Sequence, residues 1–179
     1  MPEVVLYIAS SLDGYIATAD GGVEWLSAVE LEGEDYGYQA FFDSIDALVM
    51  GSRTYEQILG FGEWPYGNKP CWVLSRRALD PVVPSVQITA ETVDGLLATL
   101  GSQGLKRIWL VGGSALIEAF ERAGRINEYI ISVVPQLLGD GLPLFVPGGR
   151  SRALELLNCR GYKSGLVQLH YRTERMNNN

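Results

Sequence analysis

The feature that most constrains the fold is an apolar strand that ends in two glycines and passes directly into a helix, at residues 108–120 (IWLVGGSALIEAF). The first four residues are apolar, and Leu116, Ile117 and Phe120 have the spacing of one helix face. Glycines allow a ligand to approach the backbone closely, and a helix N-terminus carries roughly half a positive charge. The junction is therefore suited to phosphate, although a Gly-Gly pair also fits an ordinary tight turn.

Two other apolar segments end in the same way. Residues 47–50 predict a buried strand followed by Gly-Ser-Arg-Thr at the start of a helix, and residues 70–74 predict a strand followed by Ser-Arg-Arg. In an open α/β sheet, ligands bind at the carboxyl ends of the strands. Three such junctions together favour a phosphate-bearing ligand. Neither the GxGxxG pattern after the first strand nor the GxxxxGK[ST] pattern is present, so the Rossmann fingerprint and the P-loop do not apply.

The whole chain reads as alternating strands and helices. Strands are predicted at residues 4–10, 47–50, 70–74, 86–88, 108–111 and 128–134, and helices at 36–44, 51–59, 91–100 and 114–120. Residues 153–160 and 166–172 predict a C-terminal hairpin. We therefore expect an α/β fold with a mostly parallel central sheet flanked by helices and an antiparallel C-terminal hairpin. We expect one domain over residues 1–173 and a frayed tail over 174–179.

Composition excludes several classes of function. The net charge of −7 argues against a nucleic-acid partner, and no apolar run reaches the roughly 18 residues of a membrane span. The N-terminus lacks the basic start of a signal peptide, so we expect a cytoplasmic protein. Two distant cysteines, Cys71 and Cys159, favour free thiols over a disulfide as the alternative, and with a single histidine they predict no metal site.

Five segments, in order along the chain, carry a resemblance to a known family. They are residues 11–17 (SLDGYIA), 48–55 (LVMGSRTY), 73–76 (VLSR), 111–114 (VGGS) and the Gly-Asp-Gly loop at 139–141. At these segments the chain resembles the dihydrofolate reductase superfamily, in the branch of the reductase domain of the bifunctional riboflavin-biosynthesis deaminase–reductase, as a stand-alone bacterial member. The resemblance implies a dihydrofolate reductase-like fold, an oxidoreductase that uses NADPH across the strand ends, and a homodimer.

The resemblance also implies where the cofactor would lie. The pyrophosphate would contact the Gly-Gly turn, the helix start after it and Thr54, and the nicotinamide carboxamide would meet the backbone of the first strand and of the segment after it. The 2′-phosphate would meet Ser75 and Arg76, with Arg53 or Arg77 adding charge, which favours NADPH over NADH because arginine suits phosphate. The implied cofactor residues are Ala9, Ile16, Ala17, Gly51, Arg53, Thr54, Leu74, Ser75, Arg76, Val111, Gly112, Gly113, Ser114, Ala115 and Leu116.

The resemblance implies a catalytic carboxylate early in the helix after the first loop. Counting back from the strand at 47–50 places Asp35 there, and this is the favoured residue. Counting forward from Trp25 places Glu30 there, as the second choice. Asp13 is a further candidate, although Asp-Gly is also ordinary turn chemistry. In the riboflavin-type branch this carboxylate is not a fixed feature, and acids also favour a solvated first helical turn. The remaining alternative is therefore that none of these residues is the proton donor.

The implied reaction is hydride transfer from nicotinamide C4 to a C=N or C=O carbon of a small heterocyclic or carbonyl substrate. The named candidate is the reduction of 5-amino-6-(5-phosphoribosylamino)uracil in riboflavin biosynthesis. Where that branch has basic residues for a ribose phosphate, this chain has acidic residues between 24 and 35, which would repel a phosphorylated substrate. The alternatives are a dihydrofolate reductase-like activity, a non-catalytic NADPH-binding module and a dimeric structural protein. The aromatic residues Phe42, Phe61, Trp64 and Tyr66 fit either a pocket wall or core packing.

Overall fold

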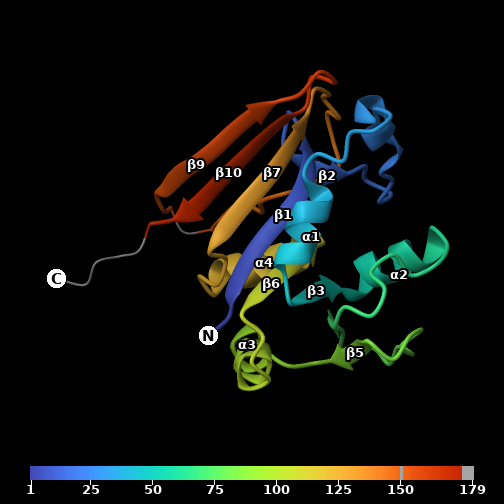
Figure 1. The fold of residues 1–179 in the computed structure, drawn as a ribbon, viewed down its shortest axis with the longest axis vertical. Helices are drawn as coiled ribbons and strands as arrows, with labels where there is room; N and C mark the ends of the chain where they lie inside the picture. Colours follow the sequence, from blue (N-terminus) through green and yellow to red (C-terminus); the bar gives the residue numbers. More distant parts are fainter. Residues whose placement is uncertain (150, 175–179) are drawn as a thin grey trace.

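An eight-stranded sheet runs through the molecule, in the computed structural model that describes residues 1–149 and 151–174 (Figure 1). The tail expected at 174–179 lies outside the described residues except for Glu174. The strand order is β5-β4-β3-β6-β1-β7-β10-β9. The strands are β1 (Glu3–Ser11), β3 (Ala47–Gly51), β4 (Cys71–Leu74), β5 (Val86–Thr89), β6 (Arg107–Gly112), β7 (Glu128–Val134), β9 (Leu154–Gly161) and β10 (Val167–Thr173).

The sheet is mostly parallel, as predicted. The pairs β1–β6, β1–β7, β3–β4, β3–β6 and β4–β5 are all parallel, while β10 is antiparallel to both β7 and β9. The central strand β1 is apolar along its first half because both of its faces are covered. The predicted fold class and the C-terminal hairpin are therefore confirmed.

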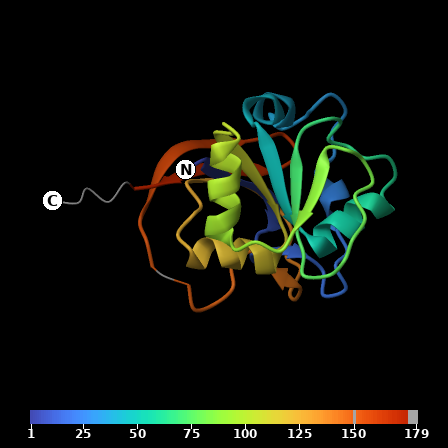
Figure 2. The ribbon, with the colours of Figure 1, turned by 90° about the horizontal axis from the view of Figure 1, so that it is seen from below.

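Helices cover both faces of the sheet. The helices α1 (Tyr38–Ser44) and α2 (Ser52–Gly60) pack on one face, while α3 (Val93–Ser102) and α4 (Ser114–Arg122) pack on the other (Figure 2). The hydroxyl of Thr92 accepts a hydrogen bond from the Gly95 N–H at 3.2 Å and so caps α3, as its position in the sequence predicts. In the described parts of the chain no helix is long and apolar enough to cross a bilayer.

Three short elements are absent from the sequence prediction. They are β2 (Tyr15–Ala17), the 3₁₀ helix η1 (Glu24–Val29) and β8 (Leu142–Pro143). The strands β2 and β8 pair with each other in a separate two-stranded sheet. Each is too short to show a periodic pattern, and their pairing depends on contacts between segments more than 100 residues apart. Sequence periodicity therefore cannot predict them.

The C-terminal hairpin has one apolar and one polar face. On one face Leu156, Leu169 and Tyr171 lie beside the core residue Ile131, whereas Gln168 is on the other face, with His170 and Arg172. All eight residues of β9 are exposed, including Leu156 at 52%. Tyr171 on β10 packs against the core, and Leu154 at the start of β9 shares a hollow with Glu118 and Glu121 of α4. The apolar face of the hairpin is therefore uncovered only on β9, around Leu156.

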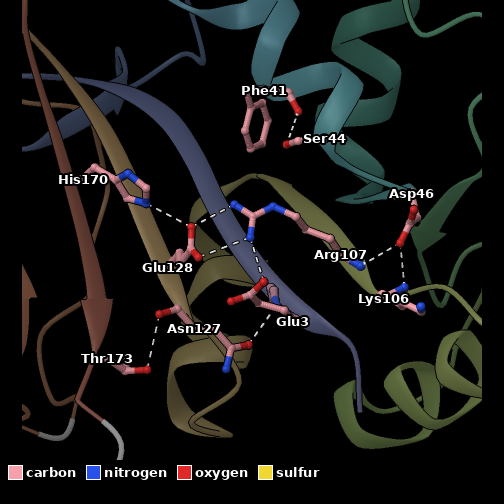
Figure 3. A network of polar contacts seen from close by, with 11 residues as sticks. Glu3, Phe41, Ser44, Asp46, Lys106, Arg107, Asn127, Glu128, His170 and Thr173 are labelled. Carbon is pink, nitrogen blue, oxygen red and sulfur yellow. Dashed lines mark hydrogen bonds and ion pairs between the residues drawn. The ribbon is translucent and has the colours of Figure 1, made fainter. Parts of the chain in front are cut away.

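A charged network joins the amino ends of β1, β6 and β7 to the neighbouring antiparallel strand β10 (Figure 3). Arg107 donates to Glu3 Oε2 at 2.7 Å and to Glu128 Oε2 at 2.8 Å, and His170 Nε2 lies 3.0 Å from Glu128 Oε2. Burial tends to raise the pKa of Glu128, but the hydrogen bonds from Arg107 and His170 outweigh it and lower that pKa to about 2. This network fastens the end of the sheet opposite to the glycine junctions.

Candidate active site

The three glycine and hydroxyl junctions lie on neighbouring strand ends, as the parallel sheet requires. Gly51 at the end of β3 is the register partner of Leu74 at the end of β4, and Met50 is the partner of Gly112 on β6. On the far side of β6, β1 continues the row toward Ala9. From β4 to β1 the row covers three inter-strand spacings, or about 15 Å. An extended ligand can therefore contact all four ends at once.

At the centre of this row the starts of two helices lie close together. A Cβ built on Gly113 would lie 3.3 Å from Thr54 Oγ1, and one built on Gly51 would lie 3.8 Å from the Gly112 carbonyl oxygen. The helices α2 and α4 begin here with Gly51 and Gly113 as their N-caps, and neither has a side-chain cap. Two helix N-termini therefore direct backbone N–H groups and partial positive charge toward the region around Thr54 and Gly113.

At this junction only some of the residues predicted to bind the cofactor have side chains that a ligand could contact. The side chain of Leu116 is 8% exposed and that of Val111 packs against the core, so each can contribute only its backbone. The Ser114 hydroxyl donates to the Pro143 carbonyl at 2.6 Å, which fastens the start of α4 to β8. Ala115 is exposed. Gly112 has φ +132°, a conformation that a side chain rarely adopts, and it forms a cis peptide with Gly113.

The end of the row at β4 carries the arginines. The Ser75 hydroxyl accepts from the Arg77 N–H and donates to the Arg77 carbonyl, both at 3.0 Å, and so closes a tight turn. The Arg77 guanidinium pairs with Glu56 at 2.8 Å. Arg53 and Arg76 are both exposed, and neither has a carboxylate partner within the described residues. These two cations are therefore available to an anion at this end, whereas Arg77 is already paired.

The other end of the row lies at Ala9, close to the short sheet of β2 and β8. Ala17 is buried, and its carbonyl lies so near the Gly-Asp-Gly loop that a Cβ on Gly141 would come within 2.2 Å of it. Asp13 fastens this loop by accepting from Leu138 N–H at 3.1 Å and Gly139 N–H at 2.7 Å. The Ser11 hydroxyl and these backbone donors lower the pKa of Asp13. The carboxylate of Asp13 therefore has a structural role in holding the loop.

A hollow of about 570 Å³ lies at the approach to α1, and Tyr36 on its wall packs against the same apolar cluster as Ala9. We call this space the α1 hollow. It is lined by Glu30, Leu31, Glu32, Glu34, Asp35, Tyr36 and Tyr38.

Asp35 lines the α1 hollow and precedes the first residue of α1 by three positions. Its carboxylate accepts from Gly37 N–H at 2.8 Å and from Gln39 N–H at 3.2 Å, and these bonds lower its pKa. Asp35 is therefore ionised at neutral pH. Glu30 also lines the hollow, and it is exposed.

A polar group that the sequence reasoning missed lies next to the hollow. Gln168 donates to the Tyr36 carbonyl at 3.2 Å and to Ser132 Oγ at 3.1 Å, and Ser132 is the register partner of Ala9. Burial raises the pKa of Tyr7 to about 12, while a side-chain hydrogen bond with Gln168 opposes the rise. Two features of the sequence could have indicated this group: Tyr7 interrupts an otherwise apolar run two residues before Ala9, and Gln168 lies on the polar face of the hairpin.

Most of the aromatic residues considered as pocket walls belong to the core. Tyr66 is 8% exposed, and its ring centroid lies 5.5 Å from that of Trp109 and 6.2 Å from that of Phe42. Trp64 stands edge-on to Tyr66 at 5.1 Å. Phe61, by contrast, is 69% exposed. Within the described residues, no group of three or more His, Cys, Asp and Glu side chains could hold a metal ion.

Comparisons with known proteins agree with this architecture. The sequence matches the RibD C-terminal domain family over residues 2–168. It is 36% identical over 170 residues to the uncharacterized protein YwjB of Bacillus subtilis (strain 168), which covers 94% of this chain and 97% of that protein. The structure of a putative riboflavin biosynthesis protein from Shewanella sp. PV-4 superposes with a TM-score of 0.89 at 31% identity and covers 97% of this chain and 99% of that one.

A more distant relative carries the family's name. The riboflavin biosynthesis protein RibD of Corynebacterium ammoniagenes is 26% identical over 155 residues, which are 79% of this chain and 45% of that protein. The present chain therefore spans less than half of RibD, in the part that the family description calls its C-terminal domain. By its sequence match and its sheet topology, the chain belongs to the RibD C-terminal domain family, the reductase domain of RibD with a dihydrofolate reductase-like fold.

Proposed function

We propose that this protein is an NADPH-dependent reductase that transfers a hydride to a small heterocyclic or carbonyl substrate. The observation that carries the proposal is the row of strand ends that joins Ser75, Gly51, Gly113 and Ala9. Along this row, two uncapped helix N-termini would hold a pyrophosphate, and Arg53 and Arg76 would hold a 2′-phosphate. When bound, NADPH supplies the hydride, and the protein supplies position and electrostatics.

The backbone of Ala9, Ile16 and Ala17 would orient the nicotinamide ring. The buried contact between the Ala17 carbonyl and Gly141 keeps this segment in place, and Asp13 fixes the loop that makes the contact. These groups would therefore set the ring at the opening of the α1 hollow, where the second substrate is to lie.

Asp35 is the carboxylate that we propose for the substrate half of the site. Because its pKa is lowered, it would act as an ionised acceptor that orients a substrate N–H and stabilises developing positive charge. In this proposal the proton that completes the reduction comes from water. Glu30, on the same hollow, is the second candidate for this role.

The pyrimidine reductase step of riboflavin biosynthesis is the first reaction to test, because the family takes its name from a riboflavin biosynthesis protein. Purified protein is titrated with NADPH while energy transfer from its tryptophans is followed, and then NADPH oxidation is measured with the pyrimidine and with dihydrofolate. Saturable NADPH binding and turnover are expected. Absence of NADPH binding would contradict the proposal, and NADPH binding without turnover of any heterocyclic or carbonyl substrate would favour a non-catalytic module.

We further propose a cytoplasmic homodimer. The uncovered apolar face of the C-terminal hairpin, with Leu156 at 52% exposure, supports an interface between two copies. The thiols of Cys71 and Cys159 are both free, which accords with a reducing compartment.

A further inference from the structure

We infer that the α1 hollow receives the substrate to be reduced and that this substrate is a flat, neutral or amine-bearing heterocycle without a phosphate group. The inference rests on the proposed function and deepens it. It is carried by the position of the hollow, by the groups at its base and by the sign of the charge on its walls.

The position of the hollow places it beside the proposed nicotinamide end of the site. Tyr38 lines the hollow, and its ring centroid lies 6.4 Å from that of Tyr7, which precedes Ala9 by two residues on β1. Gln168 connects Tyr36, on the other wall, to Ser132 beside Ala9. The hollow of about 570 Å³ is open to solvent. A molecule in the hollow would therefore lie next to the end of β1.

The groups at the base of the hollow suit a planar ring with polar edges. Tyr36 and Tyr38 present aromatic surface, on which a heterocycle can stack. The Tyr7 ring adjoins that of Tyr38, which lines the hollow, and burial raises the pKa of Tyr7 to about 12, so its phenol is protonated at neutral pH and can donate a hydrogen bond. Asp35 accepts hydrogen bonds. A ring that carries both an acceptor and an amino group would satisfy this pair.

The charge of the walls excludes an anion. Glu30, Glu32, Glu34 and Asp35 all line the hollow. All 14 lysines and arginines of the chain lie at or after Arg53, whereas ten of its 21 acidic residues precede that position. The segment that forms the hollow is therefore strongly acidic, while the basic groups of the site stand at the proposed cofactor end.

Two cations at the neighbouring end of the hairpin, one at the end of β9 and one in the turn after it, do not reverse the negative charge of the hollow. The Arg160 guanidinium lies 4.6 Å over the ring of Tyr162, whose centroid is 4.8 Å from that of Tyr36. Lys163 follows in the turn and is exposed. Neither residue lines the hollow. At physiological salt charges act over about 8 Å, so a phosphate dianion in the hollow would meet mainly the four carboxylates of its walls.

A matched pair of substrates tests the inference. The pair is 5-amino-6-(5-phosphoribosylamino)uracil and its dephosphorylated ribosyl counterpart, with NADPH oxidation as the readout and calorimetric binding to the NADP⁺-loaded protein beside it. We expect the unphosphorylated compound to have a kcat/KM at least about tenfold higher, equivalent to about 1.4 kcal/mol, and the difference to shrink as salt is added. Equal or better use of the phosphorylated compound overturns the inference, as does failure of both compounds to bind.

Variants that remove charges test whether the walls of the hollow cause the preference for the unphosphorylated compound. Glu30→Gln with Glu32→Gln should lower the KM for the phosphorylated compound by several-fold and leave the dissociation constant of NADPH unchanged. Glu118→Gln, which makes a like charge change on α4 across the sheet, should alter neither value. If the Glu30 and Glu32 change moves both compounds equally, the hollow is not the source of the discrimination. Loss of NADPH binding in the unaltered protein would instead count against the proposed function itself.

Discussion

Gly113 and Thr54 face each other across the ends of two neighbouring strands, so that a Cβ on Gly113 would lie 3.3 Å from the Thr54 hydroxyl oxygen. In the proposed function the pyrophosphate would lie against both residues, next to this close contact. Gly113→Asp would place a carboxylate there, and we expect NADPH affinity to fall by about 100-fold or more, which corresponds to about 2.7 kcal/mol. Fluorescence titration with NADPH measures the change.

The control for this change lies at the other end of α2. Gly60→Asp adds the same charge where no atom lies within 4 Å of the new Cβ, about 12 Å along the helix from its start. It should bind NADPH like the unaltered protein. Normal NADPH binding by Gly113→Asp would show that the pyrophosphate lies elsewhere.

Asp35 can be tested for its two roles with two different substitutions. Asp35→Asn removes the charge and keeps only one of the two oxygens that accept from Gly37 N–H and Gln39 N–H, so we expect kcat/KM to fall about 10- to 100-fold, as for loss of a hydrogen bond to a charged group. The NADPH affinity should stay the same, and the melting temperature should fall slightly because one backbone hydrogen bond is lost. Asp35→Ala should lower the melting temperature further because it removes both hydrogen bonds.

The pH profile gives an independent check on Asp35. Because its pKa is lowered from 3.8, the group stays ionised as pH falls through 5, and activity should not rise toward acidic pH as it would if a protonated Asp35 were required. A kcat of Asp35→Asn within twofold of the unaltered protein would leave Asp35 only its structural role as acceptor for the Gly37 and Gln39 N–H groups.

The sequence predicted the sheet because its central strands are largely apolar segments that end at glycine, proline or polar residues. Residues 47–50 are followed by Gly51 and residues 128–134 by Pro135, and the structure has strands at both places. The pairing of β2 with β8 could not be predicted in the same way. It depends on Asp13 binding the backbone of Leu138 and Gly139, more than 120 residues away, and Asp-Gly in a sequence indicates only a local turn.

For the candidate site, the sequence is most informative where backbone groups would make the contacts to a ligand. Glycine and hydroxyl residues at strand ends pointed to the junction that the structure assembles from Gly51, Thr54 and Gly113. It was least informative where side chains from distant strands converge. Gln168 reaches Ser132 and the Tyr36 carbonyl only because β10 lies antiparallel to β7. The sequence around Gln168 does not indicate that these residues are its neighbours.

The Gly-Asp-Gly loop provides a steric test of the proposed nicotinamide end. A Cβ on Gly141 would lie 2.2 Å from the Ala17 carbonyl oxygen, and Gly141 has φ +153°. Gly141→Ala must therefore displace β2 or the loop, and overpacking of this kind costs about 1–3 kcal/mol. We expect weaker NADPH binding together with lower stability to urea. Gly161→Ala, at an open position on β9, should leave the affinity for NADPH unchanged.

The uncovered face of the hairpin gives a prediction about assembly. Leu156→Glu places a charge in the middle of the proposed interface, where Leu156 is 52% exposed. Sedimentation should show a dimer for the unaltered protein and a monomer for the variant, because burial of the new carboxylate would be unfavourable. Asn158→Glu, a change on the same strand at an exposed position outside this apolar set, serves as the comparison. A monomeric unaltered protein would contradict the proposed homodimer.

Glu128 predicts how stability depends on acid. Its pKa is about 2 in the folded protein against an ordinary value of 4.5, so the folded state favours the ionised form. The stability that it contributes is therefore fully present above about pH 4.5 and is lost as pH falls from 4.5 toward 2. Glu128→Gln should be less stable than the unaltered protein at pH 7, and the two free energies of unfolding should converge as pH falls toward 2. Urea unfolding at several pH values measures both, and Glu155→Gln, which alters an exposed pair with Arg172, should show little of this pH dependence. A constant difference between Glu128→Gln and the unaltered protein across the whole range would mean that packing around Glu128, not its charge, joins the amino ends of the strands.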